Sequence, residues 1–552
     1  MKRNTLTTAV LAGLTGIAGM ASVANAVNVN PDGLGQVLLF PYYSARGGND
    51  TLISIVNTAE RGKAVKVRFI EALNSREVLD FNLYMSPFDV WTASITATDG
   101  GGAKMVTRDT SCTVPYFVGD SEDGVGEQEF LDFEYTGART NFDGGPQGIE
   151  RTASGYIEVI EMAEMAVGEG GSYDPNEDGI TPGIVEWASK HVNGVPRACS
   201  LLERFWTQND PVALWLQSAN FGFTSGTGEE ATFNGATGGL YGSGSIINVA
   251  DGTMFSYNAT AIDGFWAAGT GSHTNPGSVL PGLNSGTNAE SFVFDNGALE
   301  NNQWDSTTPV LALNAALTLD QVLNEYVTDA DINARTEWVM TFPTRRFHVD
   351  ALGKGLIDPG DDAIPPFTRT WFYTVDDGAV DRRFFACEDM SISFWDREEQ
   401  TEGIDVGPPI VSPPPPEQAP DLFQLCAEAN VIRFASDDSL PDATEILGEP
   451  LRESPFRSLG YTNFELPFDS GWARFELGAI PSNSGVFEDN DGVRRSVSST
   501  DGRQVFGLPV VGFGVTTYTN GDAGAGVLAN YGGTYQHRGT RAFVDSGADR
   551  PE

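Results

Sequence analysis

Histidine is scarce in this chain, and the compact motifs of many enzyme families are missing. The 552 residues contain four histidines, His191, His273, His348 and His537. None stands in H-x-x-x-H or H-E-x-x-H spacing, so a zinc hydrolase would have to assemble its ligands from distant segments. There is also no G-x-S-x-G elbow, no P-loop and no G-x-G-x-x-G between a strand and a helix. A Ser-His-Asp triad or a carboxylate pair would therefore have to form between segments far apart in the sequence.

Basic residues are few relative to acidic ones. The chain has 33 Lys and Arg against 75 Asp and Glu, which gives a formal net charge of −42. A protein that neutralises phosphates concentrates Lys and Arg on one face, so this balance argues against nucleic-acid binding. An anionic membrane surface would repel the chain in the same way. We expect most of the excess acid to be solvated.

Long apolar runs are missing outside the N-terminus, so no later segment is expected to span a bilayer. Residues 1–26 have a basic start at Lys2 and Arg3, an apolar run over 9–18 and the small-residue pattern Ala-Asn-Ala ending at Ala26. This pattern predicts a signal peptide cleaved after Ala26. The alternative, a membrane anchor, needs about 20 apolar residues. The sequence thus predicts an exported protein, extracellular or at the cell surface, with the periplasm as a third location.

Cysteine is also rare, and no C-x-x-C spacing occurs. The four residues Cys112, Cys199, Cys387 and Cys426 are far apart and even in number. In an oxidising compartment this pattern favours two disulfides over a metal site or a redox pair. Of the three connectivities, we expect the sequential one, because each bond then lies within one predicted domain.

Glycine and proline are abundant instead, with 64 and 30 residues, which indicates many turns and short strands. Residues 35–96 show the clearest pattern. Segments 65–69, 79–85 and 91–96 alternate apolar and polar side chains, as antiparallel strands with one buried face do. The predicted fold is mainly β, built from immunoglobulin-like β-sandwich units with a few short helices. Helices are expected at 183–192, 198–206 and, from a capping box at Thr318, 318–327.

Residues 49–58 (N-D-T-L-I-S-I-V-N-T), 65–69 (V-K-V-R-F) and 86–92 (S-P-F-D-V-W-T) together carry a resemblance. They are similar to a family of uncharacterised exported bacterial proteins, and more loosely to immunoglobulin-type sandwich modules of bacterial surface proteins. The resemblance implies an N-terminal immunoglobulin-like β-sandwich. It brings no assigned activity, so no functional residue is transferred.

The composition suggests three regions after the signal peptide. We predict a β-sandwich domain over 27–200, a Gly-rich mixed region over 201–380 and a β-rich domain over 381–552 with a Pro-rich loop at 405–420. The motif Pro-Phe-Asp-x-Trp at 87–91 has an echo, Pro-Phe-Asp-Ser-Gly-Trp, at 467–472. Either an ancient duplication or chance accounts for this echo.

A calcium loop is the sharpest candidate site. Residues 174–179 read D-P-N-E-D-G, and Asp174, Asn176 and Asp178 supply oxygen ligands at alternate positions. An EF-hand closes with Glu at position 12, which here is Val185, so a calcium loop of another type is the hypothesis. A solvated acidic turn is the alternative. Weaker candidates lie at 358–362 and 489–492.

Two functions remain open. The first is an exported structural or interaction protein of the bacterial cell surface or exterior, non-enzymatic, which binds cell-surface components or associates with itself. The alternative is a secreted carbohydrate-active enzyme or carbohydrate-binding protein that uses paired carboxylates and aromatics. Trp91, Trp187, Trp206 and Trp215 are expected mainly in cores. The three glutamates at 158, 161 and 164 are not expected to share a strand face, because odd spacing alternates sides.

Overall fold

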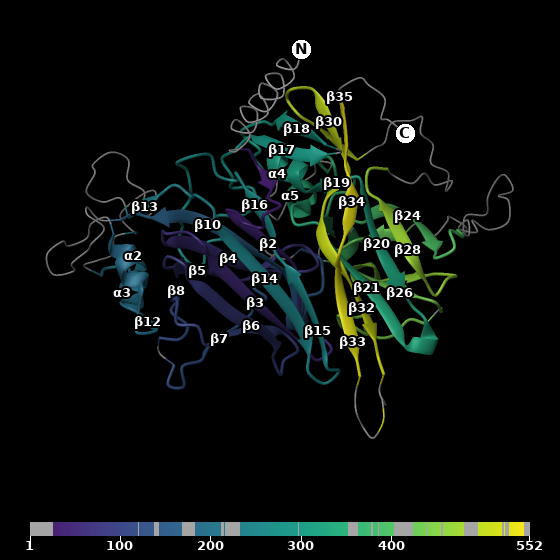
Figure 1. Cartoon of the computed structure of the whole chain (residues 1–552), viewed down its shortest axis with the longest axis horizontal. Coiled ribbons are helices and arrows are strands. Elements are labelled where there is room, and N and C mark those ends of the chain that lie inside the picture. Colours follow the sequence, from purple (N-terminus) through teal and green to yellow (C-terminus); the bar gives the residue numbers. More distant parts are fainter. Residues whose placement is uncertain are drawn as a thin grey trace, which may run out of the picture.

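The computed structural model shows a mainly β protein with several antiparallel sheets (Figure 1). No helix in the described part of the chain is long and apolar enough to cross a membrane. The predicted signal peptide before Ala26, the predicted calcium loop and the Pro-rich loop 405–420 lie outside the described residues. The structure describes residues 26–119, 121–136, 143–167, 183–210, 215, 232–295, 297–350, 363–376, 379–384, 386–401, 423–437, 439–453, 456–479, 495–520, 524 and 529–545.

Two antiparallel sheets pack face to face in the first half of the fold. The eight-stranded sheet has the order β1-β16-β2-β10-β4-β5-β8, with β13 also paired to β10, and the six-stranded sheet has the order β15-β14-β3-β6-β7-β9. Phe40, Val67, Trp91 and Ile157 are among the buried residues between them. The strands are β1 (Asn28–Val29), β2 (Val37–Ser44), β3 (Asn49–Asn57), β4 (Lys63–Glu71), β5 (Glu77–Met85), β6 (Val90–Ala97), β7 (Ala103–Thr107), β8 (Cys112–Val114), β9 (Gly126–Glu129), β10 (Ser154–Met165), β13 (Phe233–Asn234), β14 (Leu240–Asn248), β15 (Thr253–Asn258) and β16 (Thr260–Asp263).

The eight-stranded sheet is buried on its reverse face as well. The apolar residues of β4 face the shared core, as the alternation predicts. Lys66 and Arg68 point the other way, yet both are buried. Lys66 Nζ lies 2.9 Å from Asp80 Oδ2, and Arg68 pairs with Glu77 at 2.5 Å and with Glu158. The expectation of one buried face is therefore wrong for this sheet, because ion pairs remove the need for water on the second face.

Two five-stranded sheets form the second half. The outer sheet has the order β25-β24-β28-β20-β34, and the inner sheet has the order β27-β26-β21-β32-β33. A core that includes Trp338, Phe434 and Phe475 separates them. The strands are β20 (Gln321–Val327), β21 (Ala334–Thr341), β24 (Glu388–Asp396), β25 (Phe423–Leu425), β26 (Ala429–Ala435), β27 (Thr462–Glu465), β28 (Ser470–Glu476), β32 (Val511–Tyr518), β33 (Tyr531–Gln536) and β34 (Arg538–Thr540).

The inner sheet is shared by both halves. Along β21, Trp338 and Met340 enter the core facing the outer sheet, whereas Val339 enters the core of the first two sheets. Phe513 of β32 also faces the first half, where its ring stacks on Tyr257 with centroids 4.8 Å apart. Successive side chains of a strand point to opposite faces, so an almost continuous apolar strand is what this position needs.

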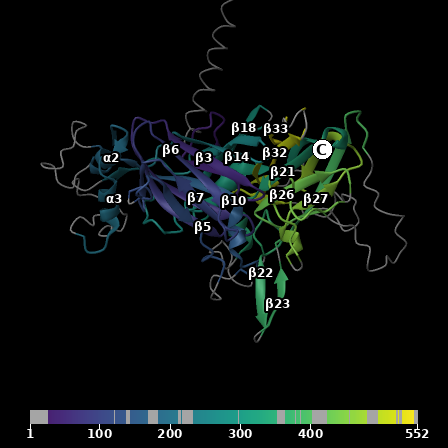
Figure 2. The same ribbon diagram turned by 90° about the horizontal axis from the view of Figure 1, so that it is seen from below.

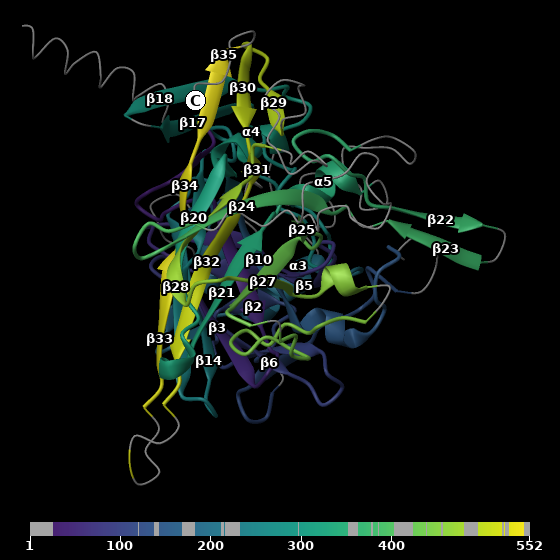
Figure 3. The same cartoon turned by 90° about the vertical axis from the view of Figure 1, so that its right-hand side faces the viewer.

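Short helices and small sheets cover the ends of the large sheets. The helix predicted at 198–206 is confirmed as α3, and the one predicted at 183–192 is confirmed in part as α2, because residues 191–192 form the strand β11. Figures 2 and 3 show that β22 and β23 project from the body of the molecule. These elements are α2 (Ile184–Ser189), α3 (Cys199–Trp206), α4 (Val310–Leu317), α5 (Arg345–Val349), η1 (Ile149–Ala153), η3 (Ala330–Ile332), η4 (Arg457–Leu459), β11 (His191–Val192), β12 (Val195–Pro196), β17 (Glu290–Asp295), β18 (Ala298–Gln303), β19 (Thr318–Leu319), β22 (Phe372–Asp376), β23 (Ala379–Phe384), β29 (Ser496–Ser498), β30 (Arg503–Phe506), β31 (Leu508–Pro509) and β35 (Ala542–Asp545).

The helix predicted over 318–327 is wrong. A helix, α4, ends at Leu317, and the segment that follows forms β19 and β20. Val322 and Tyr326 of β20 are buried and Glu325 is exposed, so the segment has one face in the core and the other outside. The capping-box spacing at Thr318 is therefore overridden by strand pairing on both sides of β20.

The predicted boundary after residue 200 does not separate the sheets. Strand β14 pairs with β3, and β16 pairs with both β1 and β2. Residues up to Asp263 thus complete sheets that begin at Asn28. The division into three domains remains a prediction.

Both sequential disulfides are confirmed. Cys112 in the edge strand β8 is bonded to Cys199 at the start of α3, and the two are 87 residues apart in sequence. Cys387 and Cys426 are 39 residues apart and flank the pairing of β24 with β25. Each bond therefore fixes a peripheral element to a large sheet.

We expect the double variant Cys112→Ala with Cys199→Ala to lose about 2–4 kcal/mol of unfolding free energy, because a long loop is no longer closed in the unfolded chain. Differential scanning calorimetry of the oxidised protein measures the loss as a lower unfolding midpoint. Serine substitution of Thr307, an exposed loop residue, is the control. An unchanged midpoint in the cysteine variant would contradict a stabilising role for this bond.

Candidate functional site

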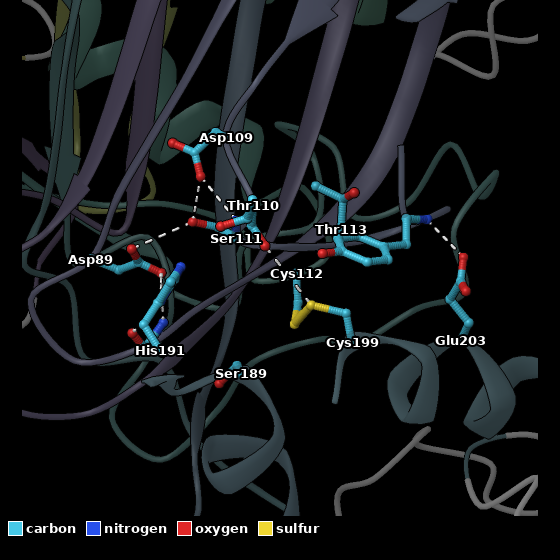
Figure 4. The surroundings of a disulfide bond; sticks show 12 residues. Asp89, Asp109, Thr110, Ser111, Cys112, Thr113, Ser189, His191, Cys199 and Glu203 are labelled. Carbon is cyan, nitrogen blue, oxygen red and sulfur yellow. Dashed lines mark hydrogen bonds and ion pairs between the residues drawn. A yellow bond between two sulfur atoms is a disulfide. The ribbon is translucent and has the colours of Figure 1, made fainter. Parts of the chain in front are cut away.

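The surroundings of the first disulfide bring several polar groups together (Figure 4). The hydroxyl of Ser111 donates to Asp109 Oδ1 at 2.7 Å and lies 3.4 Å from Asp89 Oδ1. Asp89 Oδ2 in turn lies 3.9 Å from His191 Nδ1. Burial raises the pKa of Asp89 above its usual range, and His191 partly offsets this shift. A serine, a histidine and an aspartate therefore lie in one neighbourhood, drawn from β11, the 86–89 turn and the segment before β8.

The geometry of this group differs from that of a catalytic triad. The nucleophile and the aspartate of a triad occupy opposite ring nitrogens of the histidine. Here Ser86 Oγ lies 3.5 Å from His191 Nδ1, and Asp89 approaches that same nitrogen. With both groups on Nδ1, the ring cannot relay a proton from this serine towards this aspartate. The arrangement instead ties the β11 turn to the turn that precedes β6.

Two other histidines are fixed as neutral rings inside the second half. His348 Nδ1 lies 3.2 Å from the Ile364 carbonyl oxygen, and its Nε2 lies 2.6 Å from the Asn314 amide nitrogen. His537 has the reverse pattern, with Nε2 2.9 Å from the Val339 carbonyl oxygen. Burial lowers the pKa of His348 and of His537 to about 4. Both rings act as hydrogen-bonding spacers at neutral pH.

The remaining histidine belongs to an aromatic cluster. His273 is buried, and its Nε2 lies 2.9 Å from the hydroxyl of Tyr84. The rings of Trp206, Trp215 and Phe233 surround it, with centroid distances between 4.3 and 5.2 Å. This cluster joins α3 to the eight-stranded sheet, in agreement with the expectation that Trp206 and Trp215 serve a core.

Asp174, Asn176 and Asp178 lie outside the described residues, as do segments 358–362 and 489–492. Calcium binding at Asp174, Asn176 and Asp178 therefore stays a prediction. Within the described ranges, no group of three or more His, Cys, Asp or Glu is placed to hold a metal ion.

The glutamates of β10 are closer than their spacing predicts. A register shift between Glu161 and Ala163 interrupts the alternation of β10 against β4. Glu161 and Glu164 consequently approach the same ammonium group, that of Lys63, at 2.8 and 3.6 Å. The expectation that these two carboxylates are separated is wrong, because a bulge changes which face a residue occupies.

A buried ionic cluster lies where the two halves meet. Arg151 donates to both carboxylate oxygens of Glu71 at 2.8 Å and to Asp143 Oδ1 at 3.0 Å. Burial opposes ionisation of Asp143, but the Arg151 guanidinium outweighs it and lowers the pKa of Asp143 to about 2. Arg76 continues the cluster to Asp350, which ends α5, with a contact of 2.6 Å. We call these five residues the interface cluster.

Glu428 lies next to the interface cluster. It is buried, and its charge is only weakly compensated by a cation. Its nearest cation is Arg345, whose Nη1 lies 3.9 Å from Glu428 Oε1. Arg345 donates its hydrogen bonds to the carbonyl oxygens of Cys426, at 2.9 Å, and of Ala386. Burial raises the pKa of Glu428 to about 8, with Arg345 acting in the opposite direction. Strongly shifted carboxyls are candidates for catalysis when they line a cleft, but Glu428 is fully enclosed.

The outer face of the six-stranded sheet is open and carries many hydroxyl groups. Small hydroxyl residues from neighbouring strands pair across it, with Ser54 Oγ 2.9 Å from Ser243 Oγ and Ser245 Oγ 2.8 Å from Ser256 Oγ. A shallow depression of about 460 Å³ runs over β3, β6, β7 and β14. Larger apolar residues stand around it, namely Leu52, Tyr241 and Met254, with 43%, 41% and 54% exposure. We call this surface the hydroxyl face.

Comparisons with protein-family models, with the curated proteins and with the solved structures give no match. Function is therefore inferred from the geometry of the described residues.

The interface cluster and the hydroxyl face were not predicted from the sequence. Glu71 ends an otherwise apolar and basic strand, and Arg345 and Arg346 precede a Phe-His-Val run. Charges in or beside such apolar segments are a usable signal of buried ion pairs, but the partners of Glu71 and Arg345 lie 80 or more residues away in the sequence. The hydroxyl face needs the pairing of β3 with β14, which residue spacing does not reveal.

Arg151→Met is expected to lower the free energy of unfolding by at least about 3 kcal/mol, because it leaves the Glu71 and Asp143 carboxylates buried without their cation. The control is Arg204→Met, because the side chain of Arg204 is half-exposed where it pairs with Asp210. We expect the control to change stability little, because solvent screens this exposed pair. Equal losses in both variants by denaturant unfolding would show that the interface cluster is not needed for stability.

Glu428→Gln is expected to stabilise the protein at alkaline pH. The unfolded carboxyl ionises near pH 4.3, whereas the folded carboxyl has a pKa of about 8. The folded state therefore holds an extra proton between these values, and its stability falls as the pH rises from about 4.5 to 8. The neutral amide avoids this loss.

The unfolding midpoints of the Glu428→Gln variant and the unchanged chain should coincide near pH 4.5 and diverge towards pH 8. Glu465→Gln, at an exposed position, is the matched control and should not diverge. A constant difference across the pH range would refute this role for Glu428.

Proposed function

We propose that this chain is an exported, non-enzymatic interaction protein of the bacterial cell exterior. The observation that carries the proposal is the hydroxyl face. It combines a broad, nearly flat surface of serine and threonine with a few large apolar side chains. Recognition surfaces between macromolecules have this mixed character, whereas catalytic sites are concave and enclosed.

The hydroxyl face is built for contact with a partner rather than for chemistry. Thr92 and Ser94 of β6 line the same depression as Ser54 and Ser243. In each serine pair one hydroxyl donates and the other accepts, so one hydroxyl hydrogen per pair is left to bond a partner. A partner with acceptor groups can therefore pair with this surface and also gain apolar area at Leu52 and Tyr241. We propose that the occupant is a cell-surface component.

The two disulfides support the proposed location at the cell exterior. Both join elements that are distant in sequence, and such bonds persist in oxidising compartments. The finer fold assignment belongs to the same proposal, with the eight- and six-stranded sheets as an enlarged immunoglobulin-like sandwich. Face-to-face antiparallel packing around Trp91 supports that assignment.

We expect the native protein to remain with the cell-surface fraction, and the double variant Thr92→Arg with Ser243→Arg to be released into the medium. Two long cations on the hydroxyl face prevent close approach of a partner. Asn301→Arg, on the exposed strand β18, is the matched control and should stay cell-associated. Quantitative immunoblotting of the fractions, with circular dichroism to verify folding, makes the comparison.

Free secretion of the unchanged protein, with no cell-associated fraction, would overturn the proposal. Retention of the double arginine variant in the cell-surface fraction would show that the interaction surface is not the hydroxyl face. A chelator wash in the same experiment tests the predicted calcium loop, because loss of a structural ion lowers the unfolding midpoint.

A further inference from the structure

The outer five-stranded sheet also has an exposed face, and its side chains form rows across the strands. Trp395 of β24 is directly opposite Trp472 of β28, which is opposite Glu325 of β20. The next row places Arg474 between Ser393 and Leu323. Strand alternation sends these residues outwards, while their neighbours Ala473 and Phe475 enter the core. A row with two tryptophans therefore lies beside a row that has Arg474 at its centre. We call the first of these the aromatic row.

The aromatic row is held rigidly. The rings of Trp395 and Trp472 stack with centroids 4.1 Å apart and planes 14° apart. The guanidinium of Arg474 lies over the Trp395 ring, 5.3 Å from its centroid, and also pairs with Glu476 at 2.7 Å. The stacking with Trp472 and the cation–π contact with Arg474 hold the Trp395 ring in place. Trp395 in turn supports the ring of Trp472.

Trp472 lines a groove where the chain crosses from the inner sheet to the outer sheet. Strand β33 ends at Gln536 and β34 begins at Arg538, and both contribute to the groove wall. The groove has a volume of about 420 Å³. Figure 3 shows β20, β28, β33 and β34 on one side of the molecule. Its lining includes two aromatic rings and four polar groups: Trp472, Tyr535, Asn324, Glu325, Gln536 and Arg538.

Tyr535 supplies the second aromatic wall. Its side chain is 44% exposed. The ring lies close to Gly533, where a Cβ would come within 3.1 Å of the tyrosine hydroxyl oxygen. The glycine thus gives the ring room along the strand. Asn324 donates to the Tyr535 carbonyl oxygen at 3.0 Å and so holds β33 against β20. The two aromatic walls therefore come from strands of two different sheets, β28 and β33, rather than from loops.

We propose that this groove binds a neutral glycan of hexose units. Sugar rings present an apolar face of C–H groups, which packs on aromatic rings, and an edge of adjacent hydroxyls, which need planar donors and acceptors. The groove offers Trp472 and Tyr535 for the first requirement. The Glu325 carboxylate, the Arg538 guanidinium and the Gln536 amide meet the second, because each can engage two neighbouring hydroxyls.

The charge of the groove favours a neutral ligand. One exposed carboxylate, Glu325, and one exposed guanidinium, Arg538, face it, so their charges cancel. The net charge of the chain, −42, additionally repels polyanions at a distance. A nucleic acid or an acidic polysaccharide is thus disfavoured.

This inference rests on the proposed non-enzymatic interaction role and assigns a second binding surface, apart from the hydroxyl face, with its own ligand class. The groove contains one carboxylate among its lining residues, whereas glycoside hydrolysis normally uses two. Binding without turnover is the behaviour that this arrangement supports.

Isothermal titration calorimetry of the folded, full-length protein tests the proposal. The probes are neutral hexasaccharides of glucose, mannose and N-acetylglucosamine, with a galacturonate hexamer for comparison. We expect at least one neutral hexamer to bind. Tyr535→Ala and Trp472→Ala should each weaken that binding at least tenfold, and Glu325→Gln should weaken it several-fold.

Phe294→Ala is the matched control, because Phe294 is 69% exposed but lies on β17, outside both the groove and the hydroxyl face. It should bind like the unchanged protein. Absence of binding by every neutral hexamer at millimolar concentration, binding of the galacturonate hexamer alone, or full binding by Tyr535→Ala would each overturn the proposal. Release of new reducing ends would overturn the non-enzymatic role but leave the groove as the glycan site. Free secretion with intact glycan binding would overturn only the location.

Discussion

The inner five-stranded sheet is the constraint on which the rest of the structure depends. Its central strand β21 is buried on both faces, because Val339 faces one core while Trp338 and Met340 face the other. Each half of the protein therefore uses the same strands as part of its own interior. The buried ion pairs at the margin of this sheet follow from that sharing, since charges that cannot reach solvent must be matched inside.

Burial of charge has shaped the titratable groups throughout the molecule. Arg151 compensates two carboxylates, whereas Glu428 has a distant cation and shifts in the opposite direction from Asp143. His348 and His537 are held neutral by carbonyl and amide partners. These groups resemble functional residues by their pKa values, but Asp143, Glu428 and His348 are enclosed, and the half-buried His537 is hydrogen-bonded within the fold. The accessible chemistry lies instead on the outer faces of two sheets, as hydroxyl rows and aromatic rows.

Local patterns in the sequence correctly predicted those features of the fold that neighbouring residues determine. Period-two alternation identified the strands around β4 and β6, and cysteine spacing identified both bonds. The 318–327 segment failed because pairing with β28 and β34 outweighed a capping signal. The echo at 467–472 illustrates the remaining limit: Trp91 is fully buried, whereas its counterpart Trp472 lines a surface groove. The echo has one residue more between Asp and Trp, which places the Trp on the opposite face of its strand, and whether that face is covered depends on residues far away in the chain.

The order in which the strands occur has a consequence for how the molecule forms. The first two sheets have all their strands once Asp263 is available, but the inner and outer sheets both include strands from the last residues, β33 and β34. The second half can therefore close only when the last residues of the chain are present, so its contacts of greatest sequence separation form last.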